Sequence, residues 1–302
     1  MSITIVGSVA FDTLHSHEGT RERILGGSAV YAGIAASNYA PSSIIGVVGK
    51  DFPNDYLDLL KSRKINIQDI QVLEGKTFHW TGSYLEDLNK AKTISTEIGV
   101  LGNFHPALTR DTSNSCFLFL ANNDPDILLE AIHQSRCKYI ALDTMNLWIE
   151  TKRDLLLQAL QYADIFFIND GEIRLLKDNM NIIKTSAWMF ENFQNLKYLI
   201  VKKGEYGATI FGRKPDEYFT IGAYPLHLVK DPTGAGDTFA GSFLGYICKK
   251  GSFDWATMKE ALLVGTVNAS FTVEEFGLDK LLSISVNDIE KRMDLLKKYS
   301  TL

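Results

Sequence analysis

The sequence predicts an α/β fold with a doubly wound, mostly parallel sheet that has helices on both faces. Short apolar runs alternate with amphipathic segments, and several of the runs are apolar at every position, as expected for strands buried on both faces. Such alternation requires crossover helices between parallel strands. Strands are expected at residues 2–7, 43–48, 116–121, 138–143, 164–169 and 198–202. Helices are expected at residues 28–39, 52–62, 125–135, 152–162, 171–178 and 184–193.

The last third of the chain has a different order of elements. Strands at 208–211, 217–221 and 226–229 are followed by helices at 237–249, 255–270 and 286–298. With 302 residues, 45% of them hydrophobic, the chain is long enough to bury one large core. We therefore expect a single domain over residues 1–302.

One segment departs from the strand–helix pattern. In residues 76–98, Phe78, Trp80 and Tyr84 keep a period of two, which predicts an antiparallel hairpin turning near residues 86–90. Together with residues 12–25, this hairpin would form a small sheet outside the main one. The alternatives are an ordinary surface hairpin and a lid near Gly27, and we favour the lid.

Composition argues against several classes of protein. A net charge of −5 disfavours a nucleic-acid partner. No apolar run approaches the ~18 residues of a membrane span, and no basic stretch precedes the first strand, so we expect neither a membrane segment nor a signal peptide. Three cysteines without a C-x-x-C pair favour a reducing, cytoplasmic location.

Residues 229–246 carry the strongest chemical signal. Gly234 and Gly236 form a tight turn before an apolar run at helical spacing, so Asp237 should stand at a helix N-terminus beside free backbone amides. Such an end holds anions, and an adjacent carboxylate can accept the proton of an attacking hydroxyl. These are the minimum requirements of phosphoryl transfer to an alcohol. The alternative is an ordinary glycine turn with an acidic N-cap.

The same stretch, Asp-Pro-Thr-Gly-Ala-Gly-Asp-Thr-Phe-Ala-Gly over residues 231–241, resembles the C-terminal signature of the ribokinase-like (PfkB) carbohydrate kinase family. The resemblance implies a ribokinase-like fold with Asp237 as general base. It also implies an anion hole in the turn Gly234-Ala235-Gly236-Asp237, formed by the amides of Ala235, Gly236 and Asp237. By the same resemblance Thr233 contacts the nucleotide, and Asp231 belongs to a K⁺ site, although an Asx turn before Pro232 is the alternative reading.

The N-terminal third resembles the acceptor-binding part of that family. Gly26 and Gly27 open a helix where the family brings its backbone close to the sugar, and Asp12 follows the first strand where the family places an acceptor of sugar hydroxyls. A carboxylate suits that task because it accepts from two O–H groups. Tyr31 departs from the family pattern, which usually has Asn as a sugar ligand, so ribose or fructose specificity is not implied.

Asn169 and Glu172 follow a buried strand and resemble the Asn-x-x-Glu motif, which positions Mg²⁺ and phosphate through water. The same spacing is that of a helix capping box. We favour the metal and phosphate role because of the position at a strand end, and one glutamate can serve both.

Further nucleotide contacts are implied by the resemblance at Lys202, Gly204, Gly207 and Asn268. The segment from Asp143 to Asn146 resembles an Asp-x-Asn motif with one residue inserted, but it lacks the Arg or Lys that often follows. The cation that faces the phosphate must then come from elsewhere in the chain. The candidates are Lys202, Lys203 and Arg174.

The chain has no Gly-x-x-x-x-Gly-Lys-Ser/Thr loop, which excludes a P-loop enzyme. We expect an ATP-dependent kinase that uses Mg²⁺ and, as the resemblance implies, K⁺, and that phosphorylates a hydroxyl of a small sugar or polyol. A nucleoside kinase of the same fold is the first alternative, and a non-catalytic sugar-binding sensor is the second. The resemblance also implies that a homodimer can form through the lid.

Overall fold

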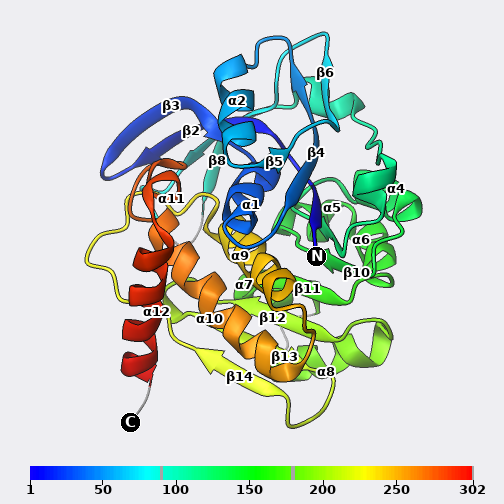
Figure 1. Cartoon of the computed structure of the whole chain (residues 1–302), viewed down its shortest axis with the longest axis vertical. Coiled ribbons are helices and arrows are strands. Elements are labelled where there is room, and N and C mark those ends of the chain that lie inside the picture. The colour runs from blue at the N-terminus through cyan, green and yellow to red at the C-terminus, as the bar shows by residue number, and fades with distance from the viewer. Residues whose placement is uncertain (89–90, 178–180, 301–302) are drawn as a thin grey trace.

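The computed structural model describes residues 1–88, 91–177 and 181–300. Its main sheet has the strand order β14-β13-β12-β11-β10-β9-β1-β4-β5, with β6 also paired to β4 (Figure 1). These strands are β1 (Ile3–Val6), β4 (Ser42–Gly49), β5 (Ile65–Asn66), β6 (Ile70–Leu73), β9 (Phe117–Leu120), β10 (Tyr139–Leu142), β11 (Ile165–Asn169), β12 (Tyr198–Lys202), β13 (Ala208–Gly212) and β14 (Tyr218–Ile221).

All strand pairs from β12 through β11, β10, β9 and β1 to β4 are parallel. Only the pairs β12–β13 and β13–β14, at one edge, are antiparallel. The predicted doubly wound, mostly parallel sheet is therefore confirmed. The carboxyl ends of the parallel strands lie along one edge, which is where sites form in such sheets.

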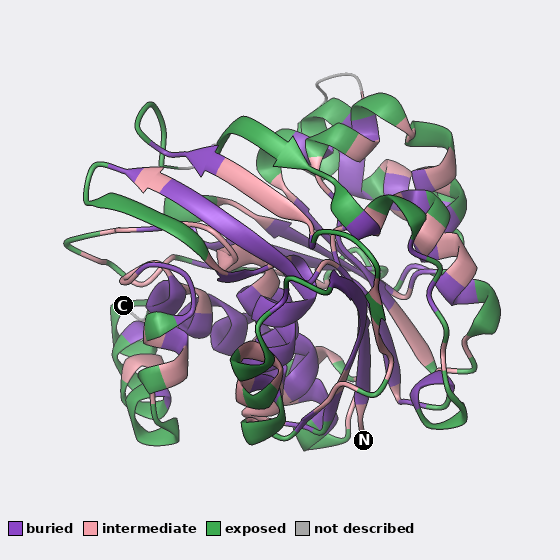
Figure 2. Ribbon diagram, turned by 90° about the horizontal axis from the view of Figure 1, so that it is seen from above, coloured by how far each residue is buried: buried purple, intermediate pink, exposed green. Residues whose placement is uncertain are grey.

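Alternate residues of the central strands enter two separate hydrophobic cores. In β9, Phe117 and Phe119 belong to one core, while Leu118 and Leu120 belong to the other. Both faces of the sheet are thus buried, as the continuous apolar runs predict, and buried residues fill the interior in Figure 2.

Helices supply the outer layers of both cores. α1 (Ser28–Ser37), α9 (Ala235–Lys250) and α10 (Trp255–Thr272) pack on the first core, and α4 (Pro125–Gln134), α6 (Arg153–Leu160), α7 (Asp170–Leu176) and α8 (Ile182–Asn192) pack on the second. The remaining helices are α2 (Asn54–Ser62), α3 (Arg110–Ser113), α5 (Asn146–Thr151), α11 (Asp279–Ser283) and α12 (Val286–Ser300), with 3₁₀ turns η1 (Gly99–Asn103) and η2 (Gly204–Tyr206).

A second, smaller sheet lies outside the main one, in the strand order β3-β2-β7-β8. It contains β2 (Ala10–Ser16), β3 (Gly19–Gly26), β7 (His79–Ser83) and β8 (Lys92–Glu97). The pairing β7–β8 is antiparallel, so the predicted hairpin is confirmed. Part of its predicted turn, residues 89–90, lies outside the described residues. Every residue of β8 is exposed, and dimerisation through this sheet stays a prediction.

The predicted strand at 226–229 is wrong, because these residues form an irregular segment. They follow the edge strand β14 without pairing to it, and the next residue, Lys230, donates its N–H to the carbonyl of Val273 just after α10. The other predicted elements are present with ends shifted by a few residues, although residue 178 of the predicted helix 171–178 lies outside the described residues.

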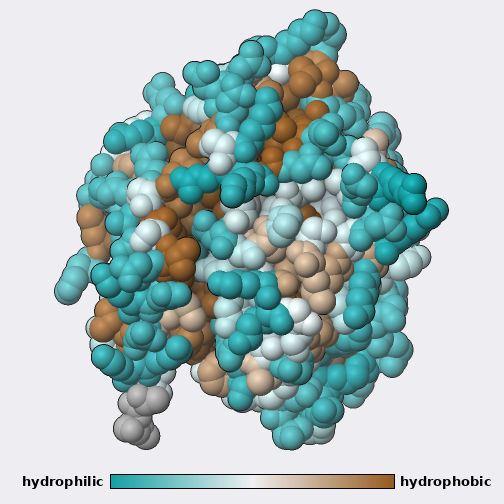
Figure 3. Space-filling model, viewed as in Figure 1, coloured by the Kyte–Doolittle hydropathy of each residue, from teal (hydrophilic) through white to brown (hydrophobic). Residues whose placement is uncertain are grey.

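The surface is mainly polar on the face drawn in Figure 3, where hydrophobic side chains form scattered patches. Within the described residues, no helix combines the length and the apolar character needed to span a bilayer.

Candidate active site

The N-terminus of α9 is shaped by its glycine cap. Gly234 has φ 72° and ψ 1°, a left-handed conformation that L side chains rarely adopt. A Cβ atom at this position would also overlap the ring of Tyr31. The sequence folds this way locally because only glycine satisfies both conditions.

Within the described residues, the first turn of α9 has two amides without a backbone acceptor. Ala235 N–H donates to Pro232 O at 3.2 Å, whereas the N–H groups of Gly236 and Asp237 have no backbone acceptor among the described residues. The expected anion hole therefore has fewer available amides than the sequence predicted, because the Ala235 amide is used within the turn. Free N–H groups at a helix N-terminus carry partial positive charge and attract anions.

A lysine and three acids converge beside this turn. Lys202, the last residue of β12, donates from Nζ to Asp143 Oδ2 at 2.6 Å, and Asp143 directly follows β10. The same Nζ lies 3.1 Å from where a Cβ of Gly236 would be. Glu172, on α7, and Asp237 are close enough for their charges to raise the pKa of Lys202.

Burial and neighbouring negative charges raise the pKa of two of these acids. Burial, together with repulsion from Asp143, raises the pKa of Asp237 to about 7, although Lys202 partly offsets the shift. The pKa of Glu172 also rises to about 7, mainly by burial, with Lys202 opposing and Asp143 reinforcing it. A carboxyl group with a pKa near neutrality suits a general base.

Asn169 and Glu172 form the capping box of α7. Asn169 N–H donates to Glu172 Oε2 at 2.9 Å, and Glu172 N–H donates to Asn169 Oδ1 at 2.8 Å. The capping box, which the sequence allowed as the alternative to a metal role, is thus present. Since Glu172 Oε1 has no hydrogen bond within the described part of the chain, one carboxylate oxygen stays available to a water or an ion.

The acceptor side of the site brings together three predicted residues. Asp12, on β2, lies against Gly26, where any Cβ would overlap its carboxyl group. Burial and the charge of Asp231 raise the pKa of Asp12 to about 8, while the backbone of Gly27 opposes this. Asp12 is also paired in register with Trp80 of β7, so both side chains share one face of the small sheet.

Two tyrosines lie between the small sheet and α9. Tyr31, on α1, is 1% exposed, and its hydroxyl has no hydrogen-bond partner in the described structure. Tyr84, just after β7, accepts a hydrogen bond from Thr233 Oγ1 at 3.1 Å. The expected substrate residue Tyr31 and the expected nucleotide residue Thr233 therefore lie at the same turn as Asp237.

Asp231 stabilises that turn by accepting hydrogen bonds from two backbone N–H groups. Its Oδ1 accepts from Thr233 N–H at 2.9 Å, and its Oδ2 accepts from Gly277 N–H at 2.8 Å. Both oxygens are used inside the chain, as the Asx-turn alternative predicts, and the K⁺ site stays a prediction. The described residues contain no cluster of three His, Cys, Asp or Glu side chains that would form a metal site by itself.

The remaining predicted residues lie on the turn between β12 and β13, on α10 and on α7. Gly204 and Gly207 form the turn between β12 and β13, directly after Lys202. Asn268 is fully buried on α10, and its amide donates to Tyr39 Oη and Val264 O, so its nitrogen is committed to packing. Arg174 is exposed on α7.

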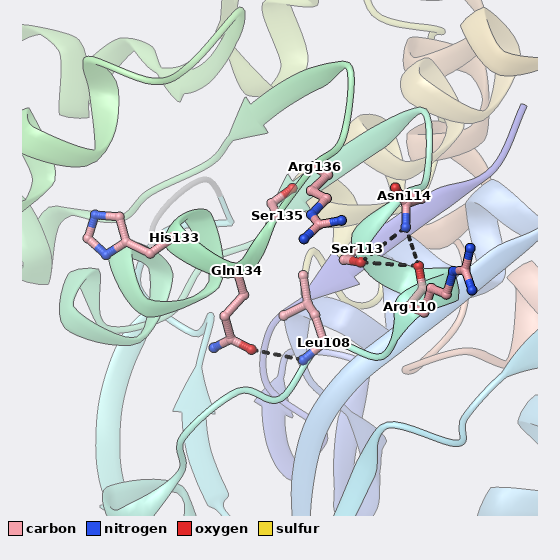
Figure 4. A pocket seen from close by; sticks show the side chains of 8 residues that line it. All are labelled: Leu108, Arg110, Ser113, Asn114, His133, Gln134, Ser135 and Arg136. Carbon is pink, nitrogen blue, oxygen red and sulfur yellow. Dashed lines mark hydrogen bonds between the residues drawn. The ribbon is translucent and has the colours of Figure 1, made fainter.

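A cavity of about 590 Å³ lies elsewhere, between α3 and the end of α4. Figure 4 shows Gln134 accepting a hydrogen bond from the backbone of Leu108 at its border. Because α3 precedes β9 and residues 133–136 precede β10, the cavity is at the amino ends of these strands. It contains none of the predicted site residues.

Two side-chain contacts of the site were not predicted from the sequence. The ion pair of Asp143 with Lys202 joins strands that are not adjacent, and the bond from Thr233 to Tyr84 spans 149 positions. The position of Asp143 at a strand end was a detectable signal. No local pattern in the sequence predicted the further hydrogen bond from Gly277 N–H to Asp231 Oδ2.

Comparison with known proteins identifies the family of the chain. Residues 2–284 match the model of the pfkB family of carbohydrate kinases, and the chain belongs to this family. It is 28% identical to a cytidine kinase of Thermococcus kodakarensis, over 82% of this chain and 88% of that one. It is 25% identical to a nucleoside kinase of Methanocaldococcus jannaschii, over 91% of both chains.

Solved structures share the fold at lower identity. A protein described as a ribokinase II of E. coli, solved with ATP and Mg²⁺, superposes with a TM-score of 0.81 at 21% identity, covering 97% of this chain and 99% of that one. The nucleoside kinase of Burkholderia thailandensis with inosine gives a TM-score of 0.78 at 22% identity, covering 98% and 99%. The ribokinase-like fold is confirmed.

Proposed function

We propose that this kinase transfers the γ-phosphoryl group of ATP to a hydroxyl of a nucleoside, with Asp237 as the general base. The observation that carries the proposal is the position of Asp237 in the first turn of α9, where the amides of Gly236 and Asp237 have no backbone acceptor in the described structure, close enough to Asp12 for their charges to interact. The charge of Asp237 contributes to the raised pKa of Asp12, as expected for carboxyl groups that face a shared site.

In the proposed reaction the acceptor hydroxyl gives its proton to Asp237 while its oxygen forms a bond to the γ-phosphorus. The bond between that phosphorus and the bridging oxygen of ADP breaks, and ADP leaves with the electron pair. The amides of Gly236 and Asp237 stabilise the charge on the phosphoryl oxygens. The small sheet excludes water, so ATP is not simply hydrolysed.

The polar groups present fit Mg²⁺ bound mainly by phosphate oxygens and water. Glu172 keeps one free carboxylate oxygen at a strand end, and Mg²⁺ in kinases is bound by one or two carboxylates together with the phosphates. Glu172 and Asn169 would hold the hydrated ion, which supplies neutralisation of the phosphate charge.

The acceptor assignment rests on the relatives and on Trp80. A cytidine kinase and a nucleoside kinase match along 88% and 91% of their own length, at 28% and 25% identity. Trp80 is on the same face of the small sheet as Asp12, and its Nε1 donates to Thr93 Oγ1 at 3.1 Å, which fixes the ring. An aromatic ring on the same face of the sheet as a hydroxyl acceptor suits a base attached to a sugar.

A free sugar or polyol is the second candidate, because an inositol 3-kinase of Arabidopsis thaliana is 23% identical over 99% of this chain. The test is a panel of nucleosides, free sugars and polyols with ATP and Mg²⁺, in which ADP release and phosphorylated product are both measured. We expect the highest kcat/KM with a nucleoside. Binding of an acceptor without any product would instead identify a sensor.

A further inference from the structure

A buried ammonium group lies where a transferred phosphoryl group would approach α9. Lys202 extends from the end of β12 across the end of β11 to reach Asp143 after β10, and its side chain is 18% exposed. Asp143 is its one hydrogen-bond acceptor among the described residues, at 2.6 Å. A lysine ammonium has three N–H groups, so two remain for other partners.

Lys202 lies beside the N-terminus of α9. Its Nζ lies 3.1 Å from the Cβ position of Gly236, next to the partly positive end of α9. Asp143 accepts a hydrogen bond from the ammonium, and Glu172 and Asp237 supply further negative charge nearby. The Gly236 amide and the free ammonium donors therefore border the same volume.

The ammonium stays charged in this setting. Burial by itself lowers the pKa of Lys202, but the negative charges of Asp143 and Glu172 outweigh burial and raise it above its usual value. Removing either acid would weaken this hold on the proton. The geometry and the charge together supply the phosphate-facing cation that the segment after Asp143 lacks.

Resting on the proposed function, we propose that Lys202 is a catalytic residue that contacts the transferring phosphoryl group, and that Asp143 is the positioning residue that directs its ammonium. The P–O bond to ADP breaks as the new O–P bond forms, with the proton going to Asp237, and Lys202 keeps its own protons throughout. Its contribution is electrostatic, because the charge on the phosphoryl oxygens develops within reach of a fixed ammonium.

The test separates this role from simple neutralisation of Asp143. Lys202→Met alone leaves Asp143 buried and unpaired, which destabilises the fold. The double variant Lys202→Met with Asp143→Asn removes both charges, so its Tm should return toward that of the wild type. We expect its kcat to stay about 10²–10³-fold low, since removal of one such donor typically costs that much. The KM for the acceptor should stay within about threefold, because Asp12 is untouched.

Lys197→Met is the matched control. Lys197 precedes β12 and pairs with Asp164 at 2.8 Å, so it forms a similar ion pair at the opposite end of the same strand. This variant should keep the turnover of the wild type. The pH dependence gives a second readout: Asp143 raises the pKa of Asp237 more than Lys202 lowers it, so the acid limb of kcat/KM should move to lower pH in the double variant, and an unmoved limb would argue against charges close to Asp237.

A binding assay decides the question independently of any acceptor. ADP with Mg²⁺ and aluminium fluoride mimics the transferring group, and calorimetry should show its affinity falling about 100-fold in the double variant while the affinity for ADP alone changes little. Equal losses for both ligands, or turnover of the double variant near wild type, would overturn the role of Lys202. Absence of transfer by the wild type with every acceptor would refute the proposed function, and the calorimetric comparison would still decide for or against Lys202.

Discussion

Thr233 Oγ1 donates a hydrogen bond to Tyr84 Oη at 3.1 Å, which connects the small sheet to the turn that begins α9. Tyr84 is also anchored by its backbone N–H, which donates to His15 O on β2 at 2.8 Å. Thr233 is four residues before Asp237. The position of the small sheet is therefore coupled directly to the turn that carries the proposed base.

Tyr84→Phe should loosen this connection without removing the ring. We expect ADP release in the absence of acceptor to rise severalfold, because water gains access to the phosphoryl group, and the KM for the acceptor to increase. Tyr218→Phe is the control, since its hydroxyl accepts a similar bond from Thr220 at 3.1 Å on the remote edge strand β14. Equal hydrolysis by both variants would argue against a lid function.

Tyr31→Phe tests the hydroxyl that departs from the family pattern. Because Tyr31 Oη is buried and has no partner in the described structure, its removal should leave Tm unchanged or slightly raised. If the hydroxyl bonds the acceptor, the KM for that acceptor should rise at constant kcat. A lower Tm with unchanged KM would assign the hydroxyl to the fold alone.

Glu172→Gln separates the capping box from the metal role. Glutamine keeps the reciprocal bonds with Asn169, so the helix and the Tm should be preserved. Loss of the charge should raise the Mg²⁺ concentration needed for half-maximal turnover and reduce kcat. A titration with Mg²⁺ indistinguishable from that of the wild type would leave Glu172 with the capping role only.

The sequence predicted the parallel sheet because several central strands are apolar at every position, as Phe117–Leu120 shows. It also predicted the positions of Asp12, Gly27 and Asp237, because glycine turns and strand ends are local signals. It misplaced a strand at 226–229, since an extended apolar segment needs a neighbour to pair with, and pairing is decided by tertiary structure. The pairing of Lys202 with Asp143 depends on the order of strands in the sheet, which no local pattern encodes.

The pH profile follows from the raised pKa of the base. Asp237 must be ionised to accept a proton, so kcat/KM should rise with pH and reach half its maximum near the pKa of about 7. The charged groups that face it are Asp143 after β10, Lys202 on β12, Glu172 on α7 and Asp12 on β2. A profile that is flat between pH 5 and 8, measured at low substrate concentrations, would contradict a base with this pKa.

The turnover of Asp237→Asn tests the central claim most directly. The folded-state pKa of Asp237 is raised, so burial of this carboxyl makes the folded protein less stable as pH rises from about 4, the ordinary pKa of the group, to about 7. Asparagine escapes this loss, and the variant should melt no lower than the wild type at pH 8 and still bind ATP. With the best acceptor of the panel, the account predicts a kcat reduced about 10²–10⁴-fold, as for removal of a general base. A folded Asp237→Asn protein with near wild-type kcat would contradict the account.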